Sequence, residues 1–171
     1  MPEPVTEFER YRTEILALLG DDEPLDVLRA SLEEVATLVA GANTEQLRAA
    51  TAPGEWSPWQ VLVHLADAEA MFGMRVRLIV TQEQPTLVGY DQDAWTARFA
   101  DLDPDPQETF TRWRALRSSN LRLYESLTPD EWNRTGMHTE RGEQSAKEVV
   151  RLAAGHDRAH IDQIRHGLIG S

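Results

Sequence analysis

The sequence predicts an all-α protein, namely a four-helix bundle with additional short helices. Apolar residues recur at the three- and four-residue spacing of amphipathic helices along four long stretches. Residues that favour helix starts precede these stretches. No stretch shows the convincing alternation of apolar and polar residues that marks a half-buried strand. Long amphipathic helices bury their apolar faces against one another, so a bundle is the expected architecture.

The first part of the chain is expected to contribute packing rather than chemistry. A short helix is predicted over about residues 5–19, where Gly20 can end it. A long helix follows over about residues 24–41, with Asp22 as its expected cap. The connection over residues 45–55 contains only a short amphipathic turn.

Strong start signals introduce the later helices. Ser57, Pro58 and Gln60 form a capping box with proline at the first helical position. Asp105 and Pro106 repeat the same pattern. The later helices are predicted over about residues 59–81, 91–102, 105–127 and 145–167, with a short helical turn at 128–132.

Length and composition are those of one globular domain. The chain has 171 residues, of which 41% are hydrophobic and 27% are charged, and both fractions are ordinary for a globular protein. We therefore expect a single domain over residues 1–171, with its core at about 24–168. Residues 133–142 are polar and are expected to form an irregular loop, in which His138 is solvated.

The charge balance and the absence of cysteine exclude several function classes. Aspartate and glutamate outnumber lysine and arginine 29 to 17, which gives a formal net charge of −12. Such a surface repels phosphate, so we expect neither nucleic acid nor an anionic membrane as a partner. Without cysteine there is no disulfide and no thiolate ligand. Residues 1–12 are polar and acidic, and no run is long enough for a membrane span, so a cytoplasmic location is expected.

Three histidines on apolar helical faces are the candidate metal ligands. His156 and His160 lie four residues apart and share one helical face with apolar neighbours. His64 interrupts the apolar face of another predicted helix. A buried imidazole needs a polar partner, and one metal ion can satisfy several rings at once. Asp67 follows His64 at i+3, where it could orient that ring or act as a base.

Other interpretations of these residues remain open. A pair of histidines on a helix is often a hydrogen-bonded core pair, and His64 could bond to a carbonyl group or to Asp67. The segment from His156 to His160 also resembles the zincin motif with aspartate in place of glutamate, but the shorter acid and the lack of strands disfavour it. A di-iron site needs repeated Glu-x-x-His ligands, which are absent. His166 is rotated away from the ligand face. The aromatic residues that could line a pocket are Trp56, Trp59, Trp95 and Tyr90.

Two segments resemble signatures of the DinB/YfiT-like superfamily. Residues 55–69 (EWSPWQVLVHLADAE) are similar to the signature of its second long helix, and residues 155–164 (GHDRAHIDQI) to its C-terminal signature. The resemblance implies a four-helix bundle, often a homodimer, with a divalent metal ion held by three histidines. Those positions are occupied here by His64, His156 and His160. Some members of the superfamily are thiol-dependent S-transferases or isomerases, and others are assigned as hydrolases.

The expected function is that of a divalent-metal-dependent enzyme. Three neutral imidazoles leave coordination positions open, as in catalytic zinc sites, so a bound water or low-molecular-weight thiol would become acidic. The expected partner is a small-molecule electrophile, with or without such a thiol, and the reaction is of the S-transferase or hydrolase type. Zinc and nickel are the preferred metals, although manganese and iron also accept imidazole. The alternative is a non-catalytic dimeric module that binds metal or acts in stress.

Overall fold

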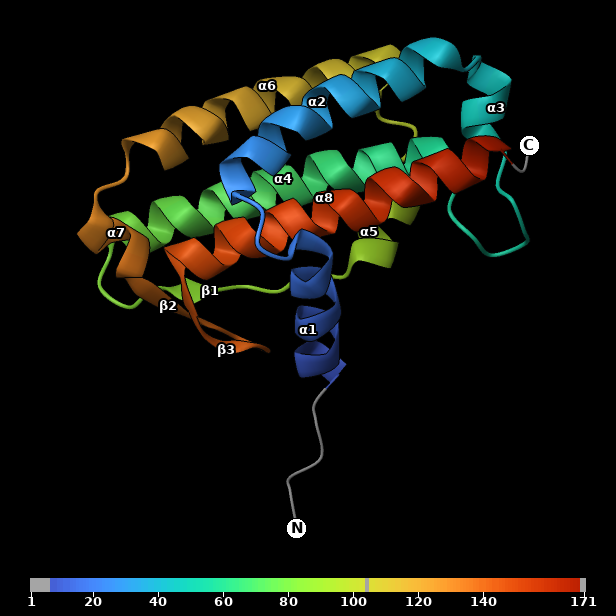
Figure 1. Cartoon of the computed structure of the whole chain (residues 1–171). Helices are drawn as coiled ribbons and strands as arrows, with labels where there is room; N and C mark the ends of the chain where they lie inside the picture. Colours follow the sequence, from blue (N-terminus) through green and yellow to red (C-terminus); the bar gives the residue numbers. More distant parts are fainter. Residues whose placement is uncertain (1–6, 104, 170–171) are drawn as a thin grey trace.

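A computed structural model describes residues 7–103 and 105–169 of the chain. The predicted all-α four-helix bundle is confirmed, with long helices α2, α4, α6 and α8 (Figure 1). The elements are α1 (Glu7–Leu19), α2 (Pro24–Gly41), α3 (Thr44–Arg48), α4 (Pro58–Thr81), β1 (Thr86–Leu87), α5 (Gln92–Phe99), α6 (Pro106–Ser126), α7 (Pro129–Asn133), β2 (Thr135–His138), β3 (Gly142–Ser145) and α8 (Ala146–Ile169).

The long helices are not arranged in the order of the sequence. Helices α4 and α2 each contact both α6 and α8, so α2 and α4 occupy diagonal positions. In Figure 1, α2 and α8 run in one direction and α4 and α6 in the other. Because α4 and α6 are parallel neighbours, residues 82–105 must return along the bundle, and they do so through β1 and α5. This crossover lies beside the α4–α8 pair.

Local capping chemistry explains where the helices begin. Ser57 and Gln60 form a complete capping box at the start of α4. The Asp105 side chain accepts a hydrogen bond from the backbone of Glu108 at the start of α6. Helix α2 differs from the expectation, because its N-cap is Glu23 without a side-chain bond. The predicted cap Asp22 instead pairs with Arg158 on α8, so a tertiary contact replaces the local one.

Two further expectations were wrong, and both concern residues 133–142. This segment is not an irregular loop, because β2 pairs with β3 antiparallel and with β1 parallel. His138 is not solvated, since it is buried at the end of β2. The strands have only two to four residues each and pack against α4 and α8. Their pairing therefore depends on tertiary contacts and not on an alternating sequence pattern.

The interior contains two apolar clusters separated by polar side chains. One cluster includes Leu28, Leu121 and Ala154, and the other includes Trp113 and Ile161. Between them each long helix contributes buried polar residues, which we call the polar layer: Ser31, Glu69, Arg117, Asn120 and Asp157. The candidate metal ligands lie at this middle level of α4 and α8.

Helix α1 packs closely on α8 beside this middle level. At Gly155, an added Cβ atom would lie 2.1 Å from the backbone oxygen of Ile15. Only glycine permits this approach of the two backbones. Helix α1 is thereby fixed next to His156, the neighbour of Gly155.

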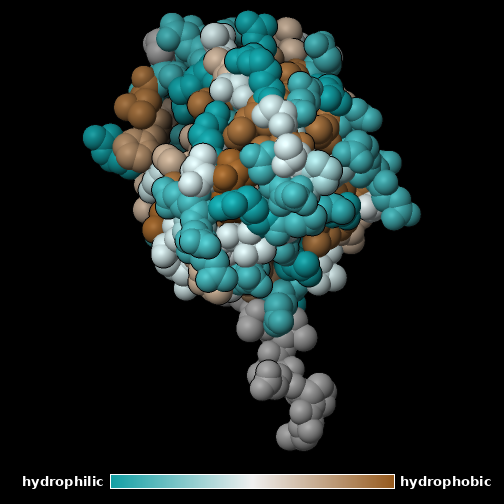
Figure 2. Space-filling model, turned by 90° about the vertical axis from the view of Figure 1, so that its left-hand side faces the viewer, coloured by the Kyte–Doolittle hydropathy of each residue, from teal (hydrophilic) through white to brown (hydrophobic). Residues whose placement is uncertain are grey.

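The described surface is largely hydrophilic. On the face shown in Figure 2, hydrophilic residues predominate and apolar ones are scattered among them. Within the described ranges, no helix combines the length and the apolar character needed to cross a membrane.

Candidate metal centre

The three candidate ligands come from the contacting helices α4 and α8. His64 lies in the second turn of α4, and His156 and His160 lie one turn apart on α8. Each offers a nitrogen atom, and these atoms all lie within 4.8 Å of one another. The ring centroid of His64 lies 5.0 Å from that of His156 and 4.6 Å from that of His160. The structure thus brings together the three histidines that the sequence singled out.

Burial keeps all three imidazoles neutral near pH 7. His64 and His156 are buried, and His160 is partly exposed. Desolvation lowers the pKa of His64 to about 3. It also lowers the pKa of His156 and of His160, with a contribution at His156 from its histidine neighbours. Neutral imidazoles carry the free lone pair that a metal ion requires.

Hydrogen bonds around the rings are consistent with coordination through Nε2. His160 Nδ1 lies 2.9 Å from Gln163 Oε1, so Nδ1 donates its proton and Nε2 carries the lone pair. The Nε2 atoms of His64 and His156 lie 2.9 Å apart. His156 Nδ1 is buried without a hydrogen-bond partner among the described residues.

This donor set fits a divalent metal ion. Two nitrogen ligands of one tetrahedral zinc ion lie roughly 3.3 Å apart, so small ring movements would convert the His64–His156 contact into two coordination bonds. No carboxylate belongs to the three-residue cluster. A metal ion held by these residues would keep its full charge and an open coordination position, as in catalytic zinc sites.

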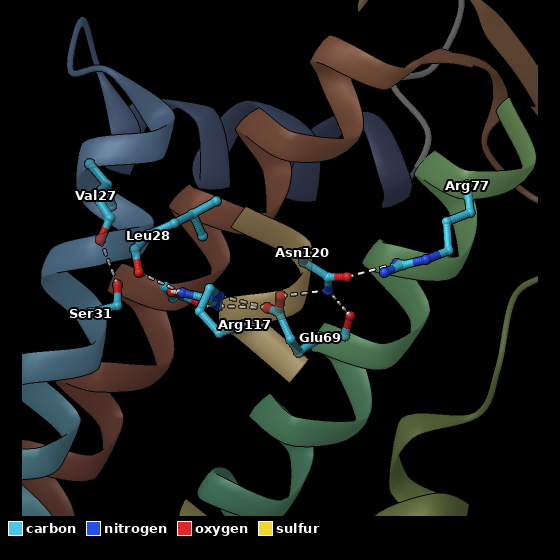
Figure 3. Close-up of polar contacts among 8 residues, drawn as sticks. Val27, Leu28, Ser31, Glu69, Arg77, Arg117 and Asn120 are labelled. Carbon is cyan, nitrogen blue, oxygen red and sulfur yellow. Dashed lines mark hydrogen bonds and ion pairs between the residues drawn. The ribbon is translucent and has the colours of Figure 1, made fainter. Parts of the chain in front are cut away.

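The polar layer fixes α8 behind His156. Arg117 on α6 donates to both carboxylate oxygens of Asp157, at 2.6 and 2.9 Å. It also donates to Glu69 on α4 at 2.8 Å and to the carbonyl oxygen of Leu28 on α2 at 2.9 Å. Figure 3 shows Arg117 between these helices. One guanidinium therefore ties together all four long helices, directly beside a candidate metal ligand.

Asn120 extends this network toward the surface. Its side-chain amide donates to the carboxylate of Glu69 at 2.7 Å, and its oxygen accepts from Arg77 at 2.7 Å (Figure 3). This network was not predicted from the sequence. A usable signal was present, because Glu69, Arg117 and Asn120 fall on otherwise apolar helical faces.

Asp67 forms its hydrogen bond with a residue other than His64. Its Oδ1 atom accepts a hydrogen bond from Arg112 at 3.1 Å, and none of its hydrogen bonds in the described ranges is with His64. Burial raises the pKa of Asp67, although Arg112 partly offsets the effect. The Oδ2 atom is buried without a partner among the described residues. The roles considered for Asp67 therefore remain predictions.

Two cavities adjoin the histidines. A cavity of about 520 Å³ includes His156, Phe72 and Tyr90 in its wall. A second one of about 460 Å³ includes His160 and Trp56. Tyr90 and Trp56 thus line cavities at the histidines, as two of the four aromatic residues proposed for that role. Trp59 lies in the apolar core, and Trp95 packs against Tyr90 at 4.5 Å between ring centroids.

Comparison with known proteins identifies the family. The sequence profile of the DinB superfamily matches residues 27–164, which include all three histidines. The chain belongs to the DinB superfamily. The family match covers α4, α6, the strands and most of α2 and α8, but not α1.

Individual relatives in the superfamily agree with this assignment. A protein of Oceanobacillus iheyensis named "Putative metal-dependent hydrolase" is 30% identical over 74% of this chain and 73% of its own length. A protein of Geobacillus kaustophilus with the same name is 30% identical over 83% and 80%. The solved structure of YfiT from Bacillus subtilis superimposes with a TM-score of 0.78 at 22% identity, covering 98% of this chain and 90% of YfiT. YfiT is described as having an unusual four-helix bundle topology, and the superposition shows that this chain has the same fold.

Proposed function

We propose that the protein is a metal-dependent hydrolase whose metal ion is held by His64, His156 and His160. The observation that carries the proposal is the convergence of three neutral imidazoles beside a cavity of substrate size. The names of the relatives, as metal-dependent hydrolases, support the same reaction class. Zinc and nickel are the proposed metals.

The chain's own residues have distinct proposed roles. A bound divalent ion would act as a Lewis acid and lower the pKa of a water or thiol molecule beside it. Gln163 orients the His160 ring through its Nδ1 atom. Trp56 packs on His64 and Phe72 on His156, with centroid distances of 5.0 and 5.6 Å, which limits the access of water to the rings.

Asp67, which follows His64 at i+3 on α4, is the proposed proton acceptor. Its raised pKa brings the carboxyl group closer to neutral pH, where a general base works best. Its charge also contributes to the raised pKa of Tyr90, a residue of the cavity wall. If Asp67 accepts a proton, Asp67→Asn should lower kcat while metal content stays unchanged.

A low-molecular-weight thiol is the competing nucleophile at the same centre. A thiol in the open position would make the enzyme an S-transferase for a small electrophile. The two reactions are separated by assaying an activated ester and an alkylating electrophile, each with and without added thiol. Hydrolysis without thiol supports the proposed function, whereas turnover only with thiol replaces it with the S-transferase.

Elemental analysis tests the site itself. The wild-type protein should contain about one divalent ion per chain, and His156→Ala should lose it. His166→Ala is the matched control, because His166 is an exposed histidine of the same helix outside the cluster. Absence of metal from the wild-type protein, even after loading with zinc or nickel, would refute the proposal and favour a non-catalytic module.

A further inference from the structure

The cavity beside His156 has an unusual charge for this protein. Its wall is formed by α1, α4, α8, the start of α5 with the segment before it, and the β2–β3 turn. Two arginines, Arg75 and Arg141, contribute to it, together with one carboxylate, Glu140. The cavity therefore has an excess of positive charge, although the chain as a whole carries a formal charge of −12. The positive charge of this cavity would attract an anionic ligand, which the rest of the acidic surface would repel.

Arg75 is a buried cation that forms no ion pair with any carboxylate in the described part of the chain. It is 3% exposed, and its Nη2 atom donates to the carbonyl oxygen of Val88 at 2.9 Å. Its Nε atom is buried and has no hydrogen-bond partner among the described residues. Arg117, which is equally buried, forms ion pairs with two carboxylates. Buried guanidinium groups are normally paired in this way. Arg75 forms no such ion pair among the described residues, and Glu140 favours its charged form only through a longer-range electrostatic effect.

Arg141 provides the second cation from the opposite wall. Its guanidinium carbon lies 5.1 Å from the ring centroid of Phe8 and 5.9 Å from that of Tyr11, both on α1. Arg141 is close enough to Arg75 to lower its pKa, after the larger effect of burial. Glu140 forms no ion pair with either arginine among the described residues. Its carboxylate instead lies against Gly89, where an added Cβ atom would be 2.7 Å away.

Two other arginines of the described chain bind carbonyl oxygens at helix ends. Arg134, in the segment leading into β2, donates to the carbonyl oxygens of Ile79 and Gln82 at the end of α4. Arg158 binds the carbonyl oxygens of Leu18 and Leu19 at the end of α1. These groups satisfy helix ends. Arg75, by contrast, donates to a single carbonyl oxygen, that of Val88 outside any helix, and both Arg75 and Arg141 line a common cavity.

We propose that this cavity binds an acidic group of the substrate between Arg75 and Arg141. Carboxylate and phosphate both match the donor geometry of guanidinium groups. The apolar part of the substrate would pack against Phe8, Tyr11 and Phe72, and its reactive group would lie toward His156. The substrate class is thus a small acid with an aromatic or apolar body. The binding of the acidic group does not depend on the proposed function. The reaction of the bound substrate at the three histidines does.

Calorimetric titration with three small probes tests the acid-binding site. Phenylacetate and phenyl phosphate carry the acidic group, and phenylacetamide is the neutral counterpart of the first. The full chain is titrated both zinc-loaded and metal-free. Either or both acids should bind at least about tenfold more tightly than the amide in both forms, because a charge-assisted pair replaces a neutral one. Which acid binds better distinguishes a carboxylate substrate from a phosphate ester.

Two variants assign the preference to the arginines. Arg141→Met should reduce acid binding about tenfold or more and leave amide binding unchanged. Arg141 is only partly buried and forms no ion pair within residues 7–103 and 105–169, so its removal leaves no described carboxylate without its cation. Arg122→Met, at an exposed position on α6 outside the cavity, is the control and should bind the acids like the wild type. Arg75→Lys is a second test that keeps the charge but removes the planar donors.

The outcomes separate this inference from the proposed function. Equal binding of acids and amide, or full acid binding by Arg141→Met, would overturn the inference even in an active metalloenzyme. Acid binding that disappears with the metal would also overturn it, because the acid would then be a metal ligand. A preference for acids in a protein that never binds metal would support the acid site and refute the proposed function.

Discussion

Replacing Arg117 with methionine would leave two buried carboxylates without their cation. Glu69 and Asp157 are each 2% exposed, so water cannot take over the role of the guanidinium. Removing one partner of a buried ion pair costs about 3–5 kcal/mol. Because Arg117 serves two carboxylates and the carbonyl oxygen of Leu28, we expect Arg117→Met to lower the free energy of unfolding by about 5 kcal/mol. This is a large part of the stability of a typical domain.

The matched control is Arg112→Met. Arg112 also contacts two carboxylates, those of Asp67 and Asp103, but its side chain is 32% exposed. Exposed ion pairs contribute about 1 kcal/mol or less, so this variant should lose correspondingly little. Urea unfolding followed by far-ultraviolet circular dichroism measures both variants under the same conditions.

A third variant separates two causes of the destabilisation by Arg117→Met, namely the unpaired carboxylates and the lost packing of the arginine side chain. Arg117→Met combined with Glu69→Gln and Asp157→Asn removes the charges that the first variant leaves unpaired. It should recover about 2 kcal/mol relative to Arg117→Met alone. If the combined variant were no more stable than the single one, or if Arg117→Met lost no more than Arg112→Met, the reasoning from buried charge would be refuted.

Two other expectations concern the histidines. Burial lowers the pKa of His64 to about 3, so between pH 6.5 and 3 the unfolded metal-free chain binds a proton at this residue and the folded chain does not. The contribution of His64 to the free energy of unfolding should therefore be fully present above about pH 6.5. It should fall by about 1.4 kcal/mol per pH unit as the pH drops toward 3. Urea midpoints of wild type and His64→Gln at several pH values check this, and an identical slope in both would contradict it. Gln163→Leu should weaken metal binding about tenfold, because His160 loses the acceptor that orients it. Competition with a chelating dye measures the affinity, with Asp162→Asn as the exposed control, and unchanged affinity in Gln163→Leu would show that Gln163 does not orient the ligand.

Local signals explain why most of the fold could be predicted. The capping box of Ser57 and Gln60 and the cap at Asp105 depend only on neighbouring residues. The periodic faces that carried His64 and His156 likewise needed no tertiary information. Their convergence followed from the assumption that buried faces meet in a bundle.

Features that depend on distant partners escaped prediction. The strand of His138 pairs with residues near 86 and 143 and has no alternating pattern of its own. The partner of Arg117 could have been any buried carboxylate, and the sequence does not identify Asp157, 40 residues away. Asp67 had a plausible neighbour in His64, but Arg112 on another helix provides a stronger electrostatic partner. In each case the deciding contact joins segments that only the folded chain brings together.

Because α1 lies close to α8 at Gly155, the wall of the cavity beside His156 combines residues of the family-matched region with residues of α1. The histidines belong to the region shared with the superfamily, residues 27–164, whereas Phe8 and Tyr11 come from a helix that precedes it. Sequence change in α1 can therefore reshape the recognition side while the coordinating side chains keep their positions. Substitutions of Phe8 or Tyr11 are therefore expected to change the affinity for a ligand in this cavity and to leave the metal content of the protein unchanged.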